Sequence, residues 1–279
     1  MRSGFVAIVG RPNVGKSTLL NRMIGRKVAI VSDKPQTTRT RVRGILDTPD
    51  AQVVFVDTPG LHKPRTALGE RLNITARESM EGVDLELFVI DATKPIGRGD
   101  EFIAGLLQKD RTIVAVNKVD VATKAQVAEQ LARAGEWDFL EYFPVSAVTG
   151  EGVPELVKGI VEKLPEGPRW YPEGTVTDVP APVMVAELVR EELLKVMREE
   201  LPHSIATRVV EWDWPRIRVE IIVERESQKG MVIGKGGRVL KRVGVAVRRQ
   251  LPPGVYLELH VRVDRNWQRS ASKVQGLGY

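Results

Sequence analysis

The sequence predicts two α/β domains, a larger one built on a doubly wound, mostly parallel sheet and a smaller one with a different order of helices and strands. The length of 279 residues suits two domains at roughly 150 residues each. From residue 5 to residue 164, short apolar runs alternate with helix-like stretches, which is typical of a parallel sheet covered on both faces. Five prolines between residues 165 and 182 then interrupt regular structure, and the pattern changes after them.

In the first domain, the short apolar runs are predicted to be strands and the segments between them to be helices. Apolar residues recur at helical spacing in 100–109 and 123–134, so these segments are expected to cover the sheet. We expect this domain to span 1–168 and a proline-rich linker to span 169–181. The predicted strands are Phe5–Val9, Val53–Val56, Leu85–Ile90, Ile113–Val116 and Tyr142–Val145.

The second domain, expected over 182–279, has the order helix, two strands, helices, strand. Two segments alternate like paired strands, and a glycine-rich patch separates two helical segments. The predicted elements are a helix over 183–201 that Pro202 ends, strands over 206–212 and 216–224 joined by a turn at 213–215, a short helix over 228–233, a basic helix over 238–250 and a strand over 255–263.

Composition excludes several functional classes. Cysteine is absent, which excludes disulfide scaffolds, thiolate metal sites and thiol catalysis, and favours a reducing compartment such as the cytoplasm. The histidines His62, His203 and His260 lie far apart in the sequence, which argues against a zinc site or a histidine-based triad. No apolar run approaches the ~18 residues that a membrane-spanning helix needs.

The net charge of +6 is concentrated in the last third of the chain. Residues 181–279 contain 18 Lys and Arg against 12 Asp and Glu, whereas the rest of the chain is balanced. Between Arg225 and Arg249, Glu226 is the single acid among eight basic residues. A solvated helix face would explain part of this excess, but such faces usually mix signs, so a polyanionic partner is favoured.

A phosphate-binding loop is predicted between the first strand and the first helix. The segment 10–17 matches G-x-x-x-x-G-K-[ST] without departure and has the required strand before it. Backbone N–H groups of such a loop and the following helix N-terminus bind phosphates, the lysine reaches the β- and γ-phosphates, and the hydroxyl ligates Mg²⁺. The predicted cradle consists of Gly10, Arg11, Pro12, Asn13, Val14, Gly15, Lys16, Ser17 and Thr18.

A second motif follows the next predicted strand. Asp57 stands at the carboxyl end of that strand, where its carboxylate could hold Mg²⁺ directly or through water. The N–H of Gly60 could meet the γ-phosphate. An Asp-Thr-Pro-Gly turn is common, so the assignment depends on its place beside the cradle. The nucleotide-contacting residues expected here are Asp57, Thr58, Pro59, Gly60 and Leu61.

Two further motifs predict a guanine base. The Asp120 carboxylate can accept two hydrogen bonds from guanine N1–H and the 2-amino group, whereas adenine has neither donor. Lys118 can lay its aliphatic stem over the base, and Asn117 can tie the loop to the cradle. The expected base-binding residues are Asn117, Lys118, Val119 and Asp120, with Ser146 and Ala147 forming a turn whose backbone N–H faces guanine O6.

In this order and spacing, the motifs resemble the GTPase superfamily and its P-loop NTPase fold. The resemblance implies that the segment 34–39 is a first switch whose threonine closes on Mg²⁺, and we favour Thr38, with Thr37 as the alternative. The expected Mg²⁺ ligands are thus Ser17, Thr38 and Asp57. Leu61 replaces the glutamine with which many GTPases orient the attacking water.

That hydrophobic replacement resembles a subgroup of GTPases that hydrolyse GTP slowly unless another group substitutes. Asn13 is similar to the asparagine with which some of them hold K⁺ beside the phosphates, where it would act electrostatically like an arginine finger. The alternative for Asn13 is a loop residue that caps its neighbours. We therefore assign catalysis to Lys16, Thr38, Gly60 and Asn13.

The glycine-rich patch of the second domain contains G-x-x-G between two helical segments, and this unit follows two strands and precedes a third. The arrangement resembles the α/β type II KH fold, whose loop clamps single-stranded nucleotides. The alternative is that these glycines only turn the chain. RNA is favoured well ahead of DNA, and the expected RNA-binding residues are Lys229, Gly234, Lys235, Gly236, Gly237, Arg238, Lys241 and Arg242.

Together the two domains, Leu61 and the Thr37-Thr38 segment resemble the Era family of GTPases over essentially the whole chain. The resemblance implies GTP/GDP-controlled binding to small-subunit, 16S-type rRNA near its 3′ end, in 30S ribosomal subunit assembly and rRNA maturation. It also implies a loose peripheral association with the inner face of the cell membrane. Two rivals remain: an RNA-placement module that senses GTP and GDP with negligible turnover, and a small-molecule kinase, which Asn117–Asp120 argues against.

Overall fold

A computed structural model describes residues 1–34, 36–61, 64, 66–197 and 201–279. These residues form two compact units. One comprises 1–31, 38–64 and 69–178, and the other comprises 179–279 together with 32–37 and 65–68. Among the helices in these ranges, none is long and apolar enough to cross a membrane.

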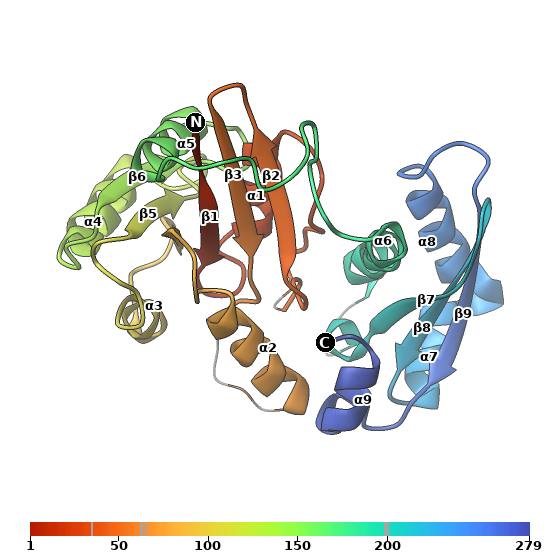
Figure 1. Ribbon diagram of the computed structural model, residues 1–279. Coiled ribbons are helices and arrows are strands. Elements are labelled where there is room, and N and C mark those ends of the chain that lie inside the picture. Colours follow the sequence, from red (N-terminus) through yellow and green to blue (C-terminus); the bar gives the residue numbers. More distant parts are fainter. Residues whose placement is uncertain (35, 62–63, 65, 198–200) are drawn as a thin grey trace. The chain divides into compact units, whose positions relative to one another are not determined.

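The first unit is built on a six-stranded sheet in the order β2-β3-β1-β4-β5-β6 (Figure 1). Every neighbouring pair is parallel except β2 and β3, which are antiparallel. The structure therefore confirms the predicted doubly wound, mostly parallel sheet and adds an edge strand, β2. The strands are β1 (Arg2–Val9), β2 (Val42–Asp47), β3 (Ala51–Asp57), β4 (Leu85–Asp91), β5 (Thr112–Asn117) and β6 (Glu141–Val145).

Among the described residues, five helices cover both faces of this sheet, and as a result β3, β4 and β5 are buried along their whole length. Leu19 of the first helix and Leu156 of the fifth pack on one face, and Ala76, Ile103 and Ala134 of the other three pack on the opposite face. The third helix ends before Gly105 and is shorter than the predicted 100–109. The helices are α1 (Lys16–Ile24), α2 (Ala67–Glu78), α3 (Arg98–Ala104), α4 (Lys124–Gly135) and α5 (Val153–Lys163).

The proline-rich segment after α5 is bound to β3 and to the edge strand β2 of the first unit. The Gln52 side chain of β3 accepts hydrogen bonds from the backbone N–H groups of Trp170 and Tyr171. Farther along, Thr177 forms an isolated bridge with Gly44 of the edge strand β2. The prolines thus prevent a helix or long strand, while backbone groups of the segment still pair with the sheet.

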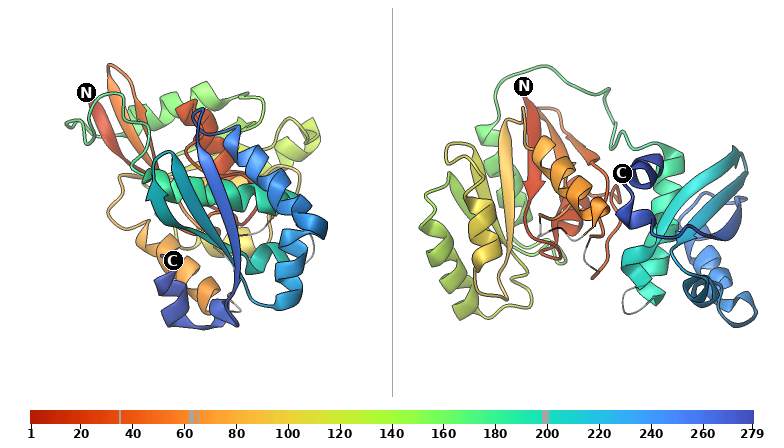
Figure 2. Two further views of the ribbon diagram at one scale, coloured as in Figure 1. Left: turned by 90° about the vertical axis from the view of Figure 1, so that its right-hand side faces the viewer. Right: turned by 90° about the horizontal axis from the view of Figure 1, so that it is seen from below.

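The second unit contains a three-stranded sheet in the order β7-β8-β9, with β7 antiparallel and β9 parallel to β8. This mixed sheet and its helices have the α/β type II KH topology that the sequence predicts, and Figure 2 gives two further views of it. The predicted helix over 183–201 is observed as α6 and ends at Val196, while residues 198–200 of the prediction lie outside the described residues. The elements are α6 (Ala181–Val196), η1 (Leu201–Ser204), β7 (Ala206–Asp213), β8 (Arg216–Val223), α7 (Glu226–Ile233), η2 (Lys235–Gly237), α8 (Arg238–Arg248), β9 (Tyr256–Val263), η3 (Trp267–Arg269) and α9 (Ala271–Gly276).

Alternation along β8 separates the two faces of this smaller sheet. Ile217, Val219 and Ile221 are buried on one face. On the other face, Arg218 pairs with Glu258 of β9 at 2.8 Å, within a row of such ion pairs. The apolar face forms the core against the helices, and the charged face is solvated.

Candidate functional site

The loop between β1 and α1 has the backbone shape that the phosphate-binding motif requires. Gly15 lies in the left-handed region at φ 100°, and a Cβ at this position would collide with the side-chain amide of Asn117. Helix α1 begins at Lys16, directly after this glycine. The loop therefore ends on a helix N-terminus whose free N–H groups and partial positive charge suit an anion.

Lys16 is buried, with 6% of its surface exposed, and its Nζ donates to the backbone oxygens of Gly10 at 3.1 Å and Arg11 at 2.9 Å. Burial lowers the pKa of Lys16 to about 8, although the nearby charge of Asp57 opposes the shift. The ammonium is thus desolvated and held by the loop itself. A phosphate chain in the cradle would supply the negative charge that this buried cation lacks.

Ser17, Thr38 and Asp57 converge beside the lysine. Ser17 Oγ donates to Asp57 Oδ2 at 2.7 Å, Thr38 Oγ1 donates to the same oxygen at 3.1 Å, and the two hydroxyls lie 2.9 Å apart. Burial raises the pKa of Asp57, and the charge of Lys16 opposes this rise. The second carboxylate oxygen, Oδ1, is buried without a hydrogen-bond partner among the described residues. Two hydroxyls and a carboxylate with an unsatisfied oxygen are a donor set that fits Mg²⁺.

Of the two switch threonines, only Thr38 takes part in this cluster. The hydroxyl of Thr37 instead donates to the backbone oxygen of Lys34 at 2.7 Å. The geometry thus brings Thr38 to Ser17 and Asp57, and leaves Thr37 hydrogen-bonded within its own loop.

The turn after β3 approaches the cradle closely. The Thr58 hydroxyl donates to the backbone oxygen of Ile8 at 2.8 Å, which fixes the turn to β1, and Pro59 follows it. A Cβ at Gly60 would lie 2.7 Å from the backbone nitrogen of Pro12, so only glycine allows this approach. Leu61 is buried in the core between the sheet and α2–α4. Its side chain therefore contributes to packing, and it offers no polar group to a water molecule at the cradle.

The predicted base-binding loop is fixed to the cradle by Asn117. Its Nδ2 donates to the backbone oxygen of Val14 at 2.8 Å, and its Oδ1 accepts from the N–H of Ala147 at 2.9 Å. Ser146 Oγ donates to Asp120 Oδ1 at 2.7 Å, while the side chain of Asp120 is exposed. The three loops are therefore held together, and the carboxylate that would recognise guanine is open to solvent. In the Ser146-Ala147 turn, which is expected to face guanine O6, the N–H of Ala147 is the group that donates to Asn117.

Lys118 links the same loops through its ammonium. Its Nζ donates to the backbone oxygen of Asn13 at 2.8 Å and to Asp91 Oδ2 at 2.6 Å. Burial alone would raise the pKa of Asp91, but hydrogen bonds from Lys118 and Thr93 outweigh it, and the pKa of Asp91 is lowered. Sequence motifs do not identify Asp91. Its place at the carboxyl end of β4 is the signal that could have found it.

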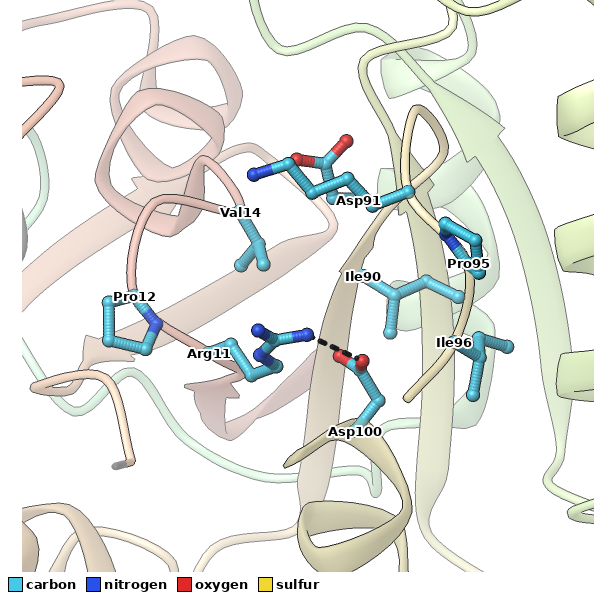
Figure 3. A pocket seen from close by; sticks show the side chains of 9 residues that line it. Arg11, Pro12, Val14, Ile90, Asp91, Pro95, Ile96 and Asp100 are labelled. Atoms are coloured by element: carbon cyan, nitrogen blue, oxygen red, sulfur yellow. Dashed lines mark hydrogen bonds and ion pairs between the residues drawn. The ribbon is translucent and has the colours of Figure 1, made fainter. Parts of the chain in front are cut away.

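Arg11 of the cradle makes an ion pair that the sequence motifs also do not identify. Its Nη1 lies 3.0 Å from Oδ2 of the buried Asp100 in α3. Figure 3 shows the guanidinium directed at this carboxylate across a small cavity beside the cradle. The cavity is lined by Arg11, Pro12, Val14, Ile90, Asp91, Lys94, Pro95, Ile96 and Asp100.

In the second unit, the G-x-x-G segment forms the turn between α7 and α8. Gly234, Gly236 and Gly237 all have positive φ, at 72°, 60° and 75°. Lys235 projects from this turn and is exposed. Glycines at these positions permit a backbone that other residues resist, and they keep side chains away from a ligand that approaches the turn.

A basic stripe continues from the turn along α8. Arg238, Lys241, Arg242 and Arg249 are exposed, whereas Val243 and Val247 on the opposite side of the helix are buried. Lys229 of α7 is half-buried. A groove of about 550 Å³ lies beside α8. The groove is lined by Glu192, Arg238, Lys241, Arg242, Val245, Ala246 and Arg249. Positive charge at this helical spacing suits the phosphates of a nucleic acid.

Two protein families match the chain in separate segments. Residues 5–118 match the family described as 50S ribosome-binding GTPase, and residues 200–268 match the KH domain family. The order of the two matches follows the order of the two units.

Similar curated proteins cover the chain from end to end. The chain is 45% identical to GTPase Era of Carboxydothermus hydrogenoformans over 293 aligned residues, which cover 100% of this chain and 98% of that protein. It is 47% identical to GTPase Era of Thermotoga petrophila over 281 aligned residues, with 96% and 94% covered.

Two solved structures share the fold over their whole length. One is Era in complex with MgGDPNP and nucleotides 1506–1542 of 16S ribosomal RNA, at 41% identity and a TM-score of 0.95, with 100% of this chain and 99% of that chain covered. The other is a variant of Aquifex aeolicus Era bound to GDP and AlF4⁻, at 40% identity and a TM-score of 0.94, with the same shares covered.

Proposed function

The chain belongs to the Era family of GTPases, and we propose that it is a GTP-controlled switch that binds small-subunit rRNA near its 3′ end. On this proposal it acts in 30S ribosomal subunit assembly and rRNA maturation. The observation that carries the proposal is full-length similarity to an Era structure that holds MgGDPNP and a segment of 16S ribosomal RNA. GTP hydrolysis to GDP and phosphate is the activity of the family.

We assign the nucleotide site residue by residue on the geometry of the cradle. Lys16 places its buried ammonium beside the β- and γ-phosphates, and the N–H of Gly60 donates to the γ-phosphate. Ser17, Thr38 and Asp57 hold Mg²⁺, which neutralises phosphate charge when bound. Because Thr38 belongs to the proposed switch segment, its contact with Mg²⁺ would depend on the γ-phosphate. The base lies against Lys118 and is recognised by Asp120.

Hydrolysis has to proceed without a glutamine after Gly60, because Leu61 occupies that position. The side chain of Leu61 is buried in the core and has no polar group that could orient water. We propose that Asn13 helps to hold K⁺ beside the phosphates. Two observations support this proposal: Asn13 is exposed within the cradle at φ 65°, and its backbone oxygen is fixed by Lys118. A monovalent cation there would stabilise the charge that develops on the transferred phosphoryl group.

We assign RNA binding to the G-x-x-G turn and the basic stripe of α8. Lys235 and Arg238 would contact phosphates of a single strand, and Lys241 and Arg242 would extend the field. Lys229 is placed at the edge of this surface. Residues 181–279 carry the whole positive excess of the chain, which supports a polyanionic partner, and the KH fold favours single-stranded RNA over DNA.

Domain boundaries and location are part of the same proposal. We place the GTPase domain at 1–168, the linker at 169–181 and the KH domain at 182–279. We place the protein in the cytoplasm, where GTP and assembling ribosomal subunits are found. A loose contact with the inner face of the membrane is supported by the basic excess of 181–279, since anionic lipid headgroups attract such segments.

The burial of Leu61 also favours one rival, an RNA-placement module whose nucleotide site turns over negligibly. Single-turnover GTP hydrolysis, measured in K⁺ and in Na⁺ at matched ionic strength and with or without the 16S 3′ segment, separates the two. Our proposal predicts faster hydrolysis in K⁺ and with RNA. Equal rates in the two salts would remove Asn13 from cation binding, and negligible hydrolysis under all conditions would favour the rival.

A further inference from the structure

Asp91 lies outside every nucleotide-binding motif of the sequence, yet its carboxylate holds a side chain from one of them. It is the last residue of β4, it is buried, and in the sheet register it pairs with Asn117 of β5. The base-binding loop begins at that neighbouring position. A carboxylate at this edge of the sheet therefore lies between the cradle and the base-binding loop.

The two carboxylate oxygens of Asp91 have separate partners. Oδ1 accepts hydrogen bonds from the Thr93 N–H at 3.0 Å and the Thr93 hydroxyl at 2.6 Å, which fix the plane of the carboxylate. Oδ2 accepts from Lys118 Nζ at 2.6 Å, and the same ammonium donates to the backbone oxygen of Asn13. The ammonium is thus held at two points, and its four-carbon stem is stretched along a defined path.

We propose that Asp91 is a positioning residue for guanine-nucleotide binding, which fixes the aliphatic stem of Lys118 in the place where the base packs. Asp91 does not touch the nucleotide and acts through Lys118. A lysine stem that is ordered before binding loses less conformational entropy when the base arrives, so affinity rises. The inference rests on the proposed function, in which Lys118 covers the base.

The alternative is that the Asp91–Lys118 ion pair only joins the ends of β4 and β5 and stabilises the fold. A double-mutant cycle on GDP affinity separates the two roles, because the two substitutions are coupled in GDP affinity only if Asp91 acts on the nucleotide through Lys118. GDP affinity is measured on the full-length chain by calorimetry for wild type, Asp91→Asn, Lys118→Met and the double variant. Lys118→Met keeps an apolar stem and removes the ammonium.

We expect Asp91→Asn to weaken GDP binding about tenfold, since a charge-assisted hydrogen bond to a buried carboxylate is lost. In the Lys118→Met background the same change should have no further effect. The ratio of GDP to IDP affinity should stay constant, because the 2-amino group is recognised by Asp120. Asp100→Asn is the matched control, since Asp100 is a second buried carboxylate on the cavity of Figure 3 but pairs with Arg11. The effect of Asp100→Asn on GDP affinity should be equal in the wild-type and Lys118→Met backgrounds.

Thermal melts report whether each variant folds. If Asp91→Asn does not fold, Thr93→Val tests the proposal through the other carboxylate oxygen, with an expected loss of about threefold that also disappears in the Lys118→Met background. An equal loss in both backgrounds would overturn the inference and leave the GTPase assignment intact. A wild-type protein that binds no GDP would instead overturn the proposed nucleotide site, and the inference with it.

Discussion

Ser17 Oγ donates a 2.7 Å hydrogen bond to Asp57 Oδ2, and this bond joins the first turn of α1 to the last residue of β3. Thr38 reaches the same carboxylate oxygen from the switch segment. The other carboxylate oxygen is buried without a partner among the described residues. Three elements that are distant in sequence thus place a donor set for Mg²⁺ at the end of the phosphate cradle.

Asp57→Asn should abolish the Mg²⁺ dependence of GTP binding. The amide keeps the shape of the side chain and an acceptor for Ser17, but it removes the charge that would ligate the metal. In the wild type, GTP affinity should increase when Mg²⁺ replaces EDTA, and the variant should bind GTP equally weakly in both. Calorimetric titration measures this, with a thermal melt to verify the fold. An unchanged response to Mg²⁺ would remove Asp57 from the metal site.

Nucleotide binding should take up protons near pH 8. Burial lowers the pKa of Lys16 to about 8 in the free protein, and a bound phosphate chain raises it again toward its ordinary value. Because the pKa is higher in the complex, the complex binds more protons, and GDP affinity falls as the pH rises above about 8.

The expected proton uptake per GDP increases between pH 7.5 and pH 8.5, as a pKa of about 8 for Lys16 requires. Calorimetry in two buffers with different ionisation enthalpies measures the uptake directly. An uptake that does not change over this range would show that Lys16 is already fully protonated or does not contact the phosphates.

Asp120→Asn should exchange guanine for xanthine specificity. The amide can donate to the 2-oxygen of xanthine, whereas it cannot accept two hydrogen bonds from guanine. The loss of the carboxylate charge and of the hydrogen bond to the 2-amino group should weaken GDP binding about 100-fold. Competition between GDP and XDP measures the preference, and Ser146→Ala tests how far the hydroxyl that holds Asp120 contributes. A variant that still prefers GDP would place Asp120 outside the base pocket.

The loop of the KH domain is open to a ligand. A Cβ at Gly236 would meet no atom within 4 Å, so Gly236→Asp puts a negative charge on the turn without a clash inside the domain. We expect this variant to lose RNA binding through charge repulsion and blocked backbone approach, while GDP affinity is retained. The positive φ of 60° adds some backbone strain, so a thermal melt accompanies the measurement.

Lys235→Ala tests the charge of the same loop separately. Loss of one phosphate contact should weaken RNA binding modestly and reduce the salt slope of the affinity by about 0.7, the value for single strands. A salt titration of RNA affinity measures both quantities. Unchanged affinity and slope would mean that Lys235 makes no phosphate contact, and the bound RNA would have to lie elsewhere.

The parts of the fold that the sequence predicts are those with a local signal. Strands β1 and β3–β6 are apolar runs, and the cradle and the base-binding loop are contiguous motifs at their carboxyl ends. The sequence does not predict strand β2, because Val42–Asp47 has neither a continuous apolar run nor alternation, and Gly44 interrupts it. Its pairing with β3 and with Thr177 is a tertiary contact that the local pattern does not encode.

The candidate nucleotide site also contains tertiary contacts that the local sequence pattern does not encode. Asp91 and Asp100 hold side chains of two loops that we assign to nucleotide binding, but each is a single carboxylate with no motif around it. Their partners Lys118 and Arg11 lie 27 and 89 residues away in the chain. Only the three-dimensional structure shows these pairs. By contrast, the resemblance to the first switch of known GTPases favours Thr38 over Thr37, and the geometry places Thr38 beside Ser17 and Asp57.

On the proposed function, guanine nucleotides control binding to the 3′ end of 16S-type rRNA. The decisive measurement is the affinity of the full-length protein for that RNA segment with a non-hydrolysable GTP analogue, with GDP and without nucleotide. A scrambled RNA of equal length and charge is the control. We predict tightest binding with the GTP analogue and weak binding to the scrambled RNA in every state. Equal affinity in all nucleotide states, or equal affinity for the scrambled RNA, would contradict the claim.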